Sequence, residues 1–279
     1  MKCAWQELLS ILPIHMRKDV DRLGKDTMQE LRLRISHPPE LVCATGSVWL
    51  PKLITDEDLS FVIHTASRYS PWAAATISRG YITANGGHRI GVCGDIVMKD
   101  DKPAGIRTPT SLCIRIARDF PGIAAKAGSI SGNILILGPP GSGKTTLLRD
   151  LIRQISNSSS GSIAVVDERG ELFPTGFYTG RRTDVLTGCR KAEAIDMLIR
   201  TMGPYCIAVD EITEAEDCNA LIRSCGCGVR ILATAHGSSV DDLKQRPIYR
   251  SLLKSKVFDT ALIMDMDKHW RAERIGKCQ

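Results

Sequence analysis

The sequence has few aromatic residues and no long apolar run. Phe, Trp and Tyr make up 5% of the 279 residues, so there is little of the stacking surface that binding to single-stranded nucleic acid requires. No apolar stretch approaches the roughly 20 residues that span a bilayer, and the N-terminal apolar stretch is too short and interrupted for a secretion signal. We therefore expect a cytoplasmic protein without a transmembrane segment of its own, and nucleic acid is disfavoured as a partner.

The sequence also lacks the cysteine spacing of a structural zinc site. Its ten cysteines are scattered, many inside apolar runs, and no two of them are spaced as C-x₂₋₄-C. Reduced, buried thiols are therefore expected, and a disulfide framework or zinc site is disfavoured. The net charge of +6 is mild and is compatible with nucleic acid, an anionic membrane surface or neither.

A strong motif stands at residues 134–150. An apolar run, Ile134 to Leu137, predicts a buried strand, and the following GPPGSGKT matches G-x-x-x-x-G-K-[ST] before an apolar helical face. The order strand, loop, helix is that of a phosphate-binding loop. The residues predicted to bind the nucleotide are Gly138, Pro139, Pro140, Gly141, Ser142, Gly143, Lys144, Thr145 and Thr146.

This loop predicts ATP and Mg²⁺ as cofactors. Gly141 and Gly143 can turn successive N–H groups inward around a phosphate, and the helix N-terminus adds partial positive charge. Lys144 supplies a point charge to the β- and γ-phosphates, and the Thr145 hydroxyl is suited to ligate Mg²⁺. ATP is the expected nucleotide because no guanine-specifying N-K-x-D element is evident.

The chain is predicted to form two domains, residues 1–122 and 123–279. The first reads as a small α+β domain, with strands at 30–35 and 111–117 and a hairpin over 81–97 that turns at 85–87. A glycine-rich connection at 121–132 precedes the second domain. There, near-continuous apolar strands alternate with helices, which predicts an α/β fold with a mainly parallel sheet.

Polar residues follow the predicted strands of the second domain. Ligands of open parallel sheets bind at the carboxyl ends of the strands, so these clusters are expected to converge. Asp210 is the predicted Mg²⁺-side residue, acting through water, and Glu211 is placed to activate the attacking water. Glu168 competes for that catalytic role, and the two remain alternatives. Thr234 and His236 are candidates to contact the γ-phosphate, or His236 is a satisfied buried histidine.

Three arginines lie in the loop-rich segment 177–193. Phosphoryl transfer requires neutralisation of charge at the γ-phosphate, often by an arginine from a neighbouring subunit, so the chain is expected to form a ring. The sequence does not decide which arginine acts in trans. The candidates are Arg181, Arg182 and Arg190.

The chain contains several longer motifs, which are ELRLRI, YITANGGHRIGVCGDIV, LCIRIAR, GPPGSGKTTLLRD, VVDERGEL, GRRTDVLTGCRKAEA, AVDEI and ATAHG. Together they resemble the stage III sporulation protein AA family, which is related to the ATPases of type II and type IV secretion and of pilus motors. The resemblance implies a RecA-like ATPase domain after a smaller domain, and a homo-oligomer in the form of a hexameric ring. It also implies ATP hydrolysis that energises a secretion-like channel complex between mother cell and forespore, with membrane proteins of that complex as partners.

Two of these motifs bear on catalysis. VVDERGEL is similar to the acidic box of secretion ATPases and implies a catalytic Glu168, whereas ATAHG is similar to their histidine box and implies a role for His236. The metal-side strand departs from the secretion pattern because Asp210 stands where glycine is usual. The resemblance places the protein at the mother-cell face of the forespore membrane. A nucleic-acid-associated or regulatory ring ATPase is the alternative.

Overall fold

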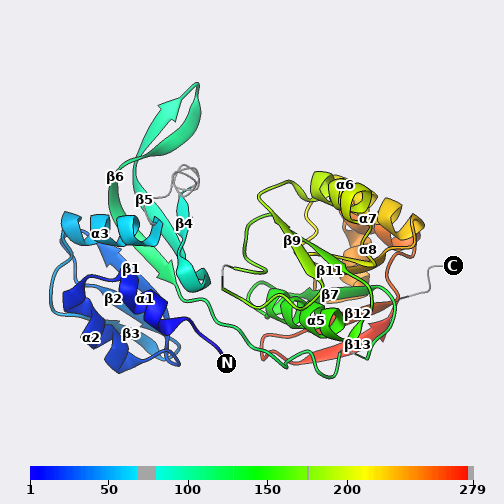
Figure 1. Cartoon of the computed structure of the whole chain (residues 1–279), viewed down its shortest axis with the longest axis horizontal. Helices are drawn as coiled ribbons and strands as arrows, with labels where there is room; N and C mark the ends of the chain where they lie inside the picture. Colours follow the sequence, from blue (N-terminus) through cyan, green and yellow to red (C-terminus); the bar gives the residue numbers. More distant parts are fainter. Residues whose placement is uncertain (68–79, 128, 175, 276–279) are drawn as a thin grey trace. The chain divides into compact units, whose positions relative to one another are not determined.

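The computed structural model describes residues 1–67, 80–127, 129–174 and 176–275. Contacts within the chain define two compact units, which are described separately (Figure 1). Unit 1 is Met1–Asp119 with Pro174–Phe177, and unit 2 is Phe120–Phe173 with Tyr178–Gln279. No helix of the described segments is long and apolar enough to cross a membrane.

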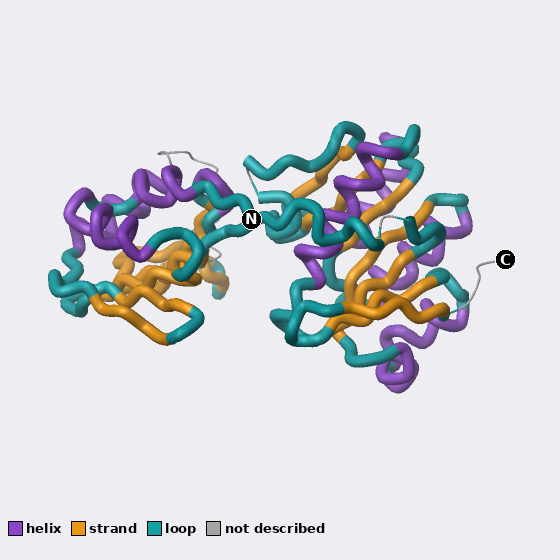
Figure 2. Tube along the Cα trace, turned by 90° about the horizontal axis from the view of Figure 1, so that it is seen from below, coloured by secondary structure: helices purple, strands orange, loops and turns teal. Residues whose placement is uncertain are grey.

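Unit 1 is an antiparallel sheet with helices on one face (Figure 2). The strand order is β3-β2-β1-β6-β5-β4. Its strands are β1 (Met28–Arg34), β2 (Glu40–Cys43), β3 (Gly46–Trp49), β4 (Tyr81–Thr83), β5 (Arg89–Lys99) and β6 (Lys102–Arg115). Its helices are α1 (Trp5–Ile11), α2 (Ile14–Leu23), α3 (Asp56–Ser67) and the 3₁₀ turn η1 (Asn85–Gly87).

Local sequence accounts for several boundaries in unit 1. Pro13 has no N–H and separates α1 from α2, where it is the N-cap. A capping box precedes α3: the Asp58 N–H donates to Thr55 Oγ1 at 3.2 Å, and the Thr55 N–H donates to Asp58 Oδ2 at 3.1 Å. Gly86 and Gly87 have φ of 75° and 81°, which lets the chain turn between β4 and β5 as the hairpin prediction requires.

Unit 2 is a mainly parallel sheet in the order β13-β12-β7-β11-β10-β8-β9, in which β13 alone is antiparallel to its described neighbour. Its strands are β7 (Ile134–Gly138), β8 (Ile163–Asp167), β9 (Thr183–Thr187), β10 (Cys206–Val209), β11 (Arg230–His236), β12 (Thr260–Met264) and β13 (Trp270–Arg274). Its helices are α5 (Lys144–Ser158), α6 (Lys191–Met202), α7 (Ala215–Gly226), α8 (Val240–Gln245), η2 (Pro247–Tyr249) and α9 (Arg250–Lys254).

Both faces of the parallel sheet are covered. Leu135 and Leu137 of β7 belong to the core cluster formed with α6, α7 and α9. Ile134 and Ile136 point to the opposite face, since side chains alternate along a strand, and all of β7 is buried. The predicted α/β class, with a mainly parallel sheet preceded by a smaller α+β domain, is therefore confirmed.

The segment predicted as a connection, 121–132, packs within unit 2. Ala124 and Ala127 are fully buried, and the N–H groups of Gly122 and Ala124 donate to Asp150 Oδ2 of α5 at 2.9 and 2.8 Å. Small residues made this stretch resemble a free linker, but their size is what lets the backbone lie against the helix. The placement of the domain boundary at 122/123 stays a prediction.

Candidate functional site

The polar residues that follow the strands of unit 2 lie at one edge of its sheet. β7, β11, β10 and β8 are consecutive neighbours and run parallel, so their carboxyl ends meet at the same edge. The register pairs His236 of β11 with Gly138 of β7. Asp210 and Glu211 directly follow β10, which lies beside β11.

The loop of residues 138–145, here called the glycine-rich loop, has the backbone that its glycines predict. Gly141 and Gly143 have φ of 77° and 95°, and Gly143 in its left-handed conformation caps α5. A Cβ at Gly138 would lie 2.5 Å from Ser142 Oγ and 3.1 Å from the Met264 carbonyl oxygen. Only glycine therefore fits where β7 enters the loop, whereas a Cβ at Gly141 would meet open space.

Lys144 is folded into the glycine-rich loop. Its Nζ donates to the carbonyl oxygens of Gly138 and Pro139 at 2.8 and 2.9 Å and lies 3.1 Å from His236 Nδ1. Burial lowers the pKa of the Lys144 ammonium, and the nearby Asp210 and Glu211 carboxylates oppose that shift. The side chain is a buried cation held by acceptors that an anion could replace.

Hydroxyl groups hold Asp210 from two sides. Thr145 Oγ1 donates to Asp210 Oδ2 at 2.9 Å, and the buried Thr234 Oγ1 donates to Asp210 Oδ1 at 2.7 Å. Burial raises the pKa of Asp210, and these two hydrogen bonds offset part of the rise. Thr234 Oγ1 also accepts the Glu211 N–H at 2.7 Å. Glu211 has φ of 56°, a left-handed conformation that is strained for a residue with a Cβ.

His236 connects Lys144 to Glu211. Its Nδ1 faces the Lys144 ammonium, and its Nε2 lies 3.0 Å from Glu211 Oε1. Because the ammonium can only donate, Nδ1 must accept and Nε2 must carry the proton. The histidine therefore bridges the lysine of the glycine-rich loop and one of the two candidate carboxylates.

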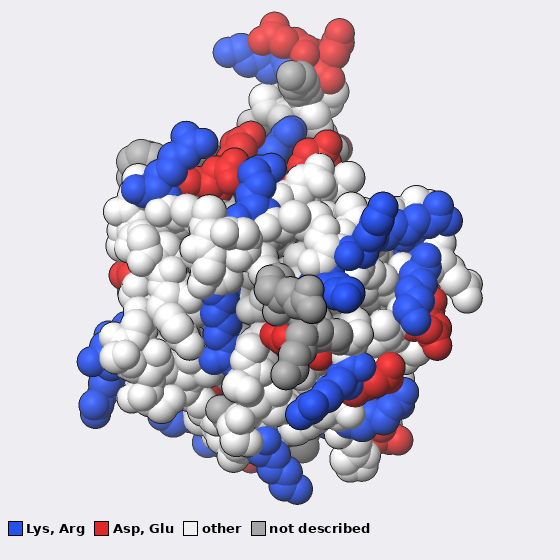
Figure 3. Space-filling view, turned by 90° about the vertical axis from the view of Figure 1, so that its right-hand side faces the viewer, with Lys and Arg blue, Asp and Glu red and all other residues white. Residues whose placement is uncertain are grey.

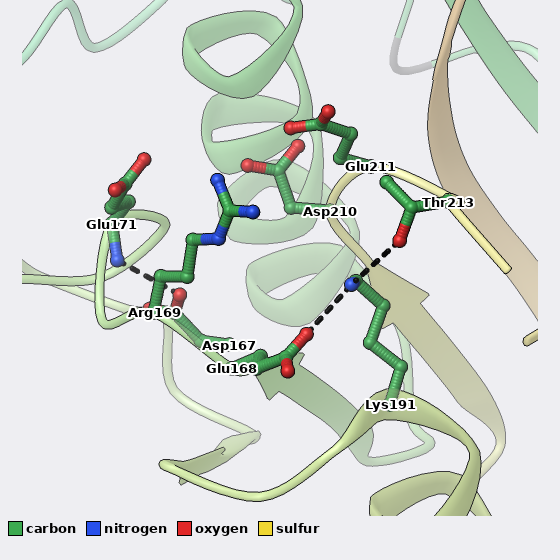
Figure 4. Close-up of a pocket in the computed structure, with 8 residues that line it drawn as sticks. All are labelled: Asp167, Glu168, Arg169, Glu171, Lys191, Asp210, Glu211 and Thr213. Atoms are coloured by element: carbon green, nitrogen blue, oxygen red, sulfur yellow. Dashed lines mark hydrogen bonds and ion pairs between the residues drawn. The ribbon is translucent and has the colours of Figure 1, made fainter. Parts of the chain in front are cut away.

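The residues after β8 are held differently. Asp167 accepts backbone N–H groups of Glu171, Leu172 and Phe173 at 2.9 to 3.0 Å, so its carboxylate orders the following turn. Glu168 Oε2 accepts from the Nζ of the nearly buried Lys191 at 2.7 Å. Figure 4 shows Glu168 and Lys191 across the pocket from Asp210 and Glu211, with Arg169 extending into it.

These residues fit a nucleoside triphosphate with a magnesium ion. The buried Ser142 Oγ has no hydrogen-bond partner, and Lys144 and the α5 N-terminus supply positive charge beside the open side of Gly141. Thr145 and Asp210 are hard oxygen donors. The described residues contain no group of three or more His, Cys, Asp or Glu that could hold a metal ion, so water and phosphate oxygens would complete the coordination.

The predicted arginines are divided between the two edges of the sheet. Arg181 and Arg182 precede β9, whose amino end lies beside that of β8, so they are at the edge opposite the glycine-rich loop. Arg182 Nη1 donates to the Ser159 carbonyl oxygen at 2.6 Å, beyond the C-terminus of α5. Arg190, by contrast, is the N-cap of α6 at the same edge as the loop.

Comparison with known proteins places the chain in a family. The model of the family described as "Sporulation stage III, protein AA" matches residues 3–275. The chain belongs to this family. Stage III sporulation protein AA of Bacillus subtilis (strain 168) is 36% identical over 281 residues, which cover 94% of this chain and 91% of that protein.

Solved structures of an ATPase and of a pilus motor share the fold of this family member. The Legionella pneumophila ATPase DotB aligns with a TM-score of 0.60 at 15% identity, covering 94% of this chain and 80% of that one. The pilus retraction motor PilT with bound ADP aligns with a TM-score of 0.63 at 14% identity, covering 89% and 76%. At this identity the likeness concerns the fold alone.

Two lysines at the site of this family member were missed in the sequence. Lys191 opens α6 and binds Glu168, but a single lysine at a helix start gives no distinguishing signal. Lys268 lies in the turn between β12 and β13, and its Nζ donates to the Gly141 carbonyl oxygen. It could have been found only by recognising β13, whose mostly exposed residues carry no apolar pattern.

Proposed function

We propose that the chain is a Mg²⁺-dependent ATPase that hydrolyses ATP to ADP and phosphate. The observation that carries the proposal is the hydrogen bond from Thr145 to Asp210 at 2.9 Å. It joins the end of the glycine-rich loop to the end of β10, and a hydroxyl beside a carboxylate at this point suits a magnesium ion between the loop and the neighbouring strand.

In this proposal each side chain has a defined task. Lys144 would exchange the carbonyl oxygens of Gly138 and Pro139 for the β- and γ-phosphate oxygens. The exchange is favourable because the hydrogen bonds of an ammonium to charged phosphate oxygens are stronger than those to neutral carbonyl oxygens. Thr145 would ligate the magnesium ion, and Asp210 would hold it through water. When bound, the ion neutralises charge that develops on the phosphate oxygens.

Glu211 is the proposed general base, ahead of Glu168. Glu211 lies close enough to oppose the pKa shift of Lys144, and His236 bridges the two residues. Glu168 is instead neutralised by Lys191 at 2.7 Å. One carboxylate oxygen of Glu168 is therefore already occupied by a buried ammonium, whereas Glu211 lies beside the histidine that contacts the lysine of the glycine-rich loop.

The biological role that we propose follows from family membership. The B. subtilis relative is named for sporulation stage III, and the fold is shared with the ATPase DotB and the pilus retraction motor PilT. ATP hydrolysis would energise a secretion-like channel complex between mother cell and forespore. The protein would act there as a homo-oligomeric ring, hexameric in the simplest case, on membrane proteins at the mother-cell face.

The test is phosphate release by purified wild type and three variants. Lys144→Ala should abolish turnover, Glu211→Gln should lower it at least about a hundredfold while ATP still binds, and Glu168→Gln should stay within about fivefold of wild type. Wild-type protein that neither binds nor hydrolyses ATP would overturn the function. A deficit in Glu168→Gln alone would move the catalytic role to Glu168.

The same assay distinguishes the alternative of a nucleic-acid-associated ATPase. On the face in Figure 3, the Lys and Arg side chains of the described residues stand in separate groups among acidic and uncharged ones. A strand-tracking protein would need a continuous basic groove. Stimulation of turnover by single-stranded DNA or RNA would favour this alternative over the secretion role.

A further inference from the structure

The turn between β12 and β13 lies against the glycine-rich loop. Lys268 Nζ donates to the Gly141 carbonyl oxygen. A Cβ at Gly143 would lie 3.6 Å from Lys268 Cδ and 3.6 Å from Met264 Cε. The aliphatic stem of Lys268 therefore passes beside Gly143 before its ammonium reaches Gly141.

The sheet order gives the direction in which a bound nucleotide extends. β7 has β11 on one side and β12 on the other. Asp210 and Glu211 follow β10, and His236 is the last residue of β11, so the groups proposed to act on the γ-phosphate and magnesium lie on the β11 side. The phosphates bind at the loop after β7, and the nucleoside must extend away from the γ-phosphate, which is toward β12 and its turn.

The turn is built to hold Lys268 in place. The Asp265 N–H donates to the His269 carbonyl oxygen at 3.0 Å, and the His269 N–H donates to Asp265 Oδ1 at 2.9 Å. Lys268 itself has φ of 69°. The side chain is exposed, yet it is fixed at its backbone by the turn and at its ammonium by Gly141. A lysine fixed at both ends presents its methylene stem as an apolar surface.

We propose that Lys268 forms the nucleoside wall of the nucleotide site, with its stem covering the ribose and base of the bound nucleotide. This inference rests on the proposed function. It assigns a ligand contact to a turn that carries no part of the phosphate-binding motif, and it predicts that the contact contributes to binding of the nucleoside but not of the phosphates.

The experiment compares two ligands, ADP and inorganic pyrophosphate, both with Mg²⁺, in calorimetric titrations of the full chain. Lys268→Ala should weaken ADP binding about tenfold, and Lys268→Met, which keeps an apolar stem on the same turn, should stay within about threefold of wild type. Pyrophosphate should bind both variants within about twofold of wild type.

Lys256→Ala is the matched control. Lys256 is also exposed and has φ of 49°, but it precedes β12 and therefore lies at the opposite edge of the sheet. The variant loses the same lysine side chain and the same charge at a position away from the site. It should bind ADP as wild type does. Thermal unfolding without ligand shows whether each variant is folded.

Three results would overturn the assignment. ADP binding by Lys268→Ala that equals wild type would show that the stem makes no contact. Equal loss of ADP and pyrophosphate binding would show that Lys268 acts on the phosphates or on the loop. ADP binding by Lys268→Met that is as weak as binding by Lys268→Ala would show that the apolar stem is not what contacts the nucleoside. If wild type itself binds no ADP, the proposed function fails, which is a separate result.

Discussion

Lys144 and Asp210 are charged groups that unit 2 holds out of water. Burial lowers the pKa of Lys144 and raises that of Asp210, so in both residues burial opposes the charged form. Folding alone would favour uncharged side chains at these positions. The phosphates of a bound triphosphate would compensate the positive charge of Lys144, and a magnesium ion would compensate the negative charge of Asp210. We therefore expect binding of both to restore the stability that burial of these charges removes.

Asp210→Asn tests this conflict between stability and function. The folded state retains the Asp210 proton to a higher pH than the unfolded chain, because the folded pKa is raised above the ordinary value of 3.8. The carboxyl group therefore contributes its full stability below the unfolded pKa and loses it as pH rises through the folded pKa. The side-chain amide of the variant keeps an acceptor and a donor for the two threonines but does not ionise.

We expect the difference in melting temperature, variant minus wild type, to increase as pH rises from about 4 to 7 without ligand. With Mg²⁺ and ATP present, wild type should have the higher melting temperature of the two proteins. Turnover of the variant should fall roughly a hundredfold. Differential scanning fluorimetry over this pH range measures the first effect and phosphate release the second. A difference that decreases toward neutral pH would contradict the raised pKa.

At the scale of elements, the strands of unit 2 that are buried along their whole length could be predicted from the sequence. β7, β8 and β10 are buried along their whole length, so their apolar runs alone revealed them, and the glycine-rich loop followed from residue spacing. β9 and β13 were missed because their side chains are partly or mostly exposed. The pairing of Lys191 with Glu168 and the placement of Lys268 were missed because they depend on tertiary contacts between distant segments.

The helix that follows the glycine-rich loop is fastened near its middle. Asp150 of α5 is buried, and its Oδ2 accepts the N–H groups of Gly122 and Ala124 together with Gln154 Nε2 at 3.0 Å. Asp150 Oδ1 lies 3.6 Å from Arg153 Nη1. The carboxylate therefore joins the start of unit 2 to the helix that positions Lys144.

Asp150→Ala should destabilise unit 2 by about 3 kcal/mol, because it leaves the buried N–H group of Ala124 and the partly buried N–H group of Gly122 without their acceptor. Asp150→Asn retains one acceptor oxygen and should lose less. Urea unfolding followed by circular dichroism measures both, with Asp241→Ala on the exposed face of α8 as the control. Equal urea midpoints for Asp150→Ala and the control would show that the stability of unit 2 does not depend on this carboxylate.

At the scale of the whole molecule, the two edges of the unit 2 sheet carry different chemistry. The glycine-rich loop, Asp210, Glu211 and His236 occupy the carboxyl edge, whereas Arg181 and Arg182 lie at the amino edge. Neither arginine can reach the proposed nucleotide site of its own chain, because the length of the strands separates them. Both arginines are exposed, but the side chain of Arg182 is engaged by the Ser159 carbonyl oxygen, so Arg181 is the better candidate to act on a neighbouring subunit.

Mixing two inactive variants tests this geometry. Arg181→Ala keeps its nucleotide site but offers no arginine, and Lys144→Ala offers the arginine but has no working site. Each variant alone should be inactive. A one-to-one mixture should recover about a quarter of the wild-type rate, because one interface in four of a randomly mixed ring pairs an intact site with an intact arginine.

The wild-type rate per subunit should also increase with protein concentration, because a shared site exists only after assembly. Arg200→Ala, which removes an exposed arginine from the C-terminal turn of α6, is the control for loss of charge and should be active alone. A mixture that stays inactive while its subunits still assemble in sedimentation would exclude Arg181 as the arginine that acts in trans. A dilute monomer with full activity would exclude shared sites altogether.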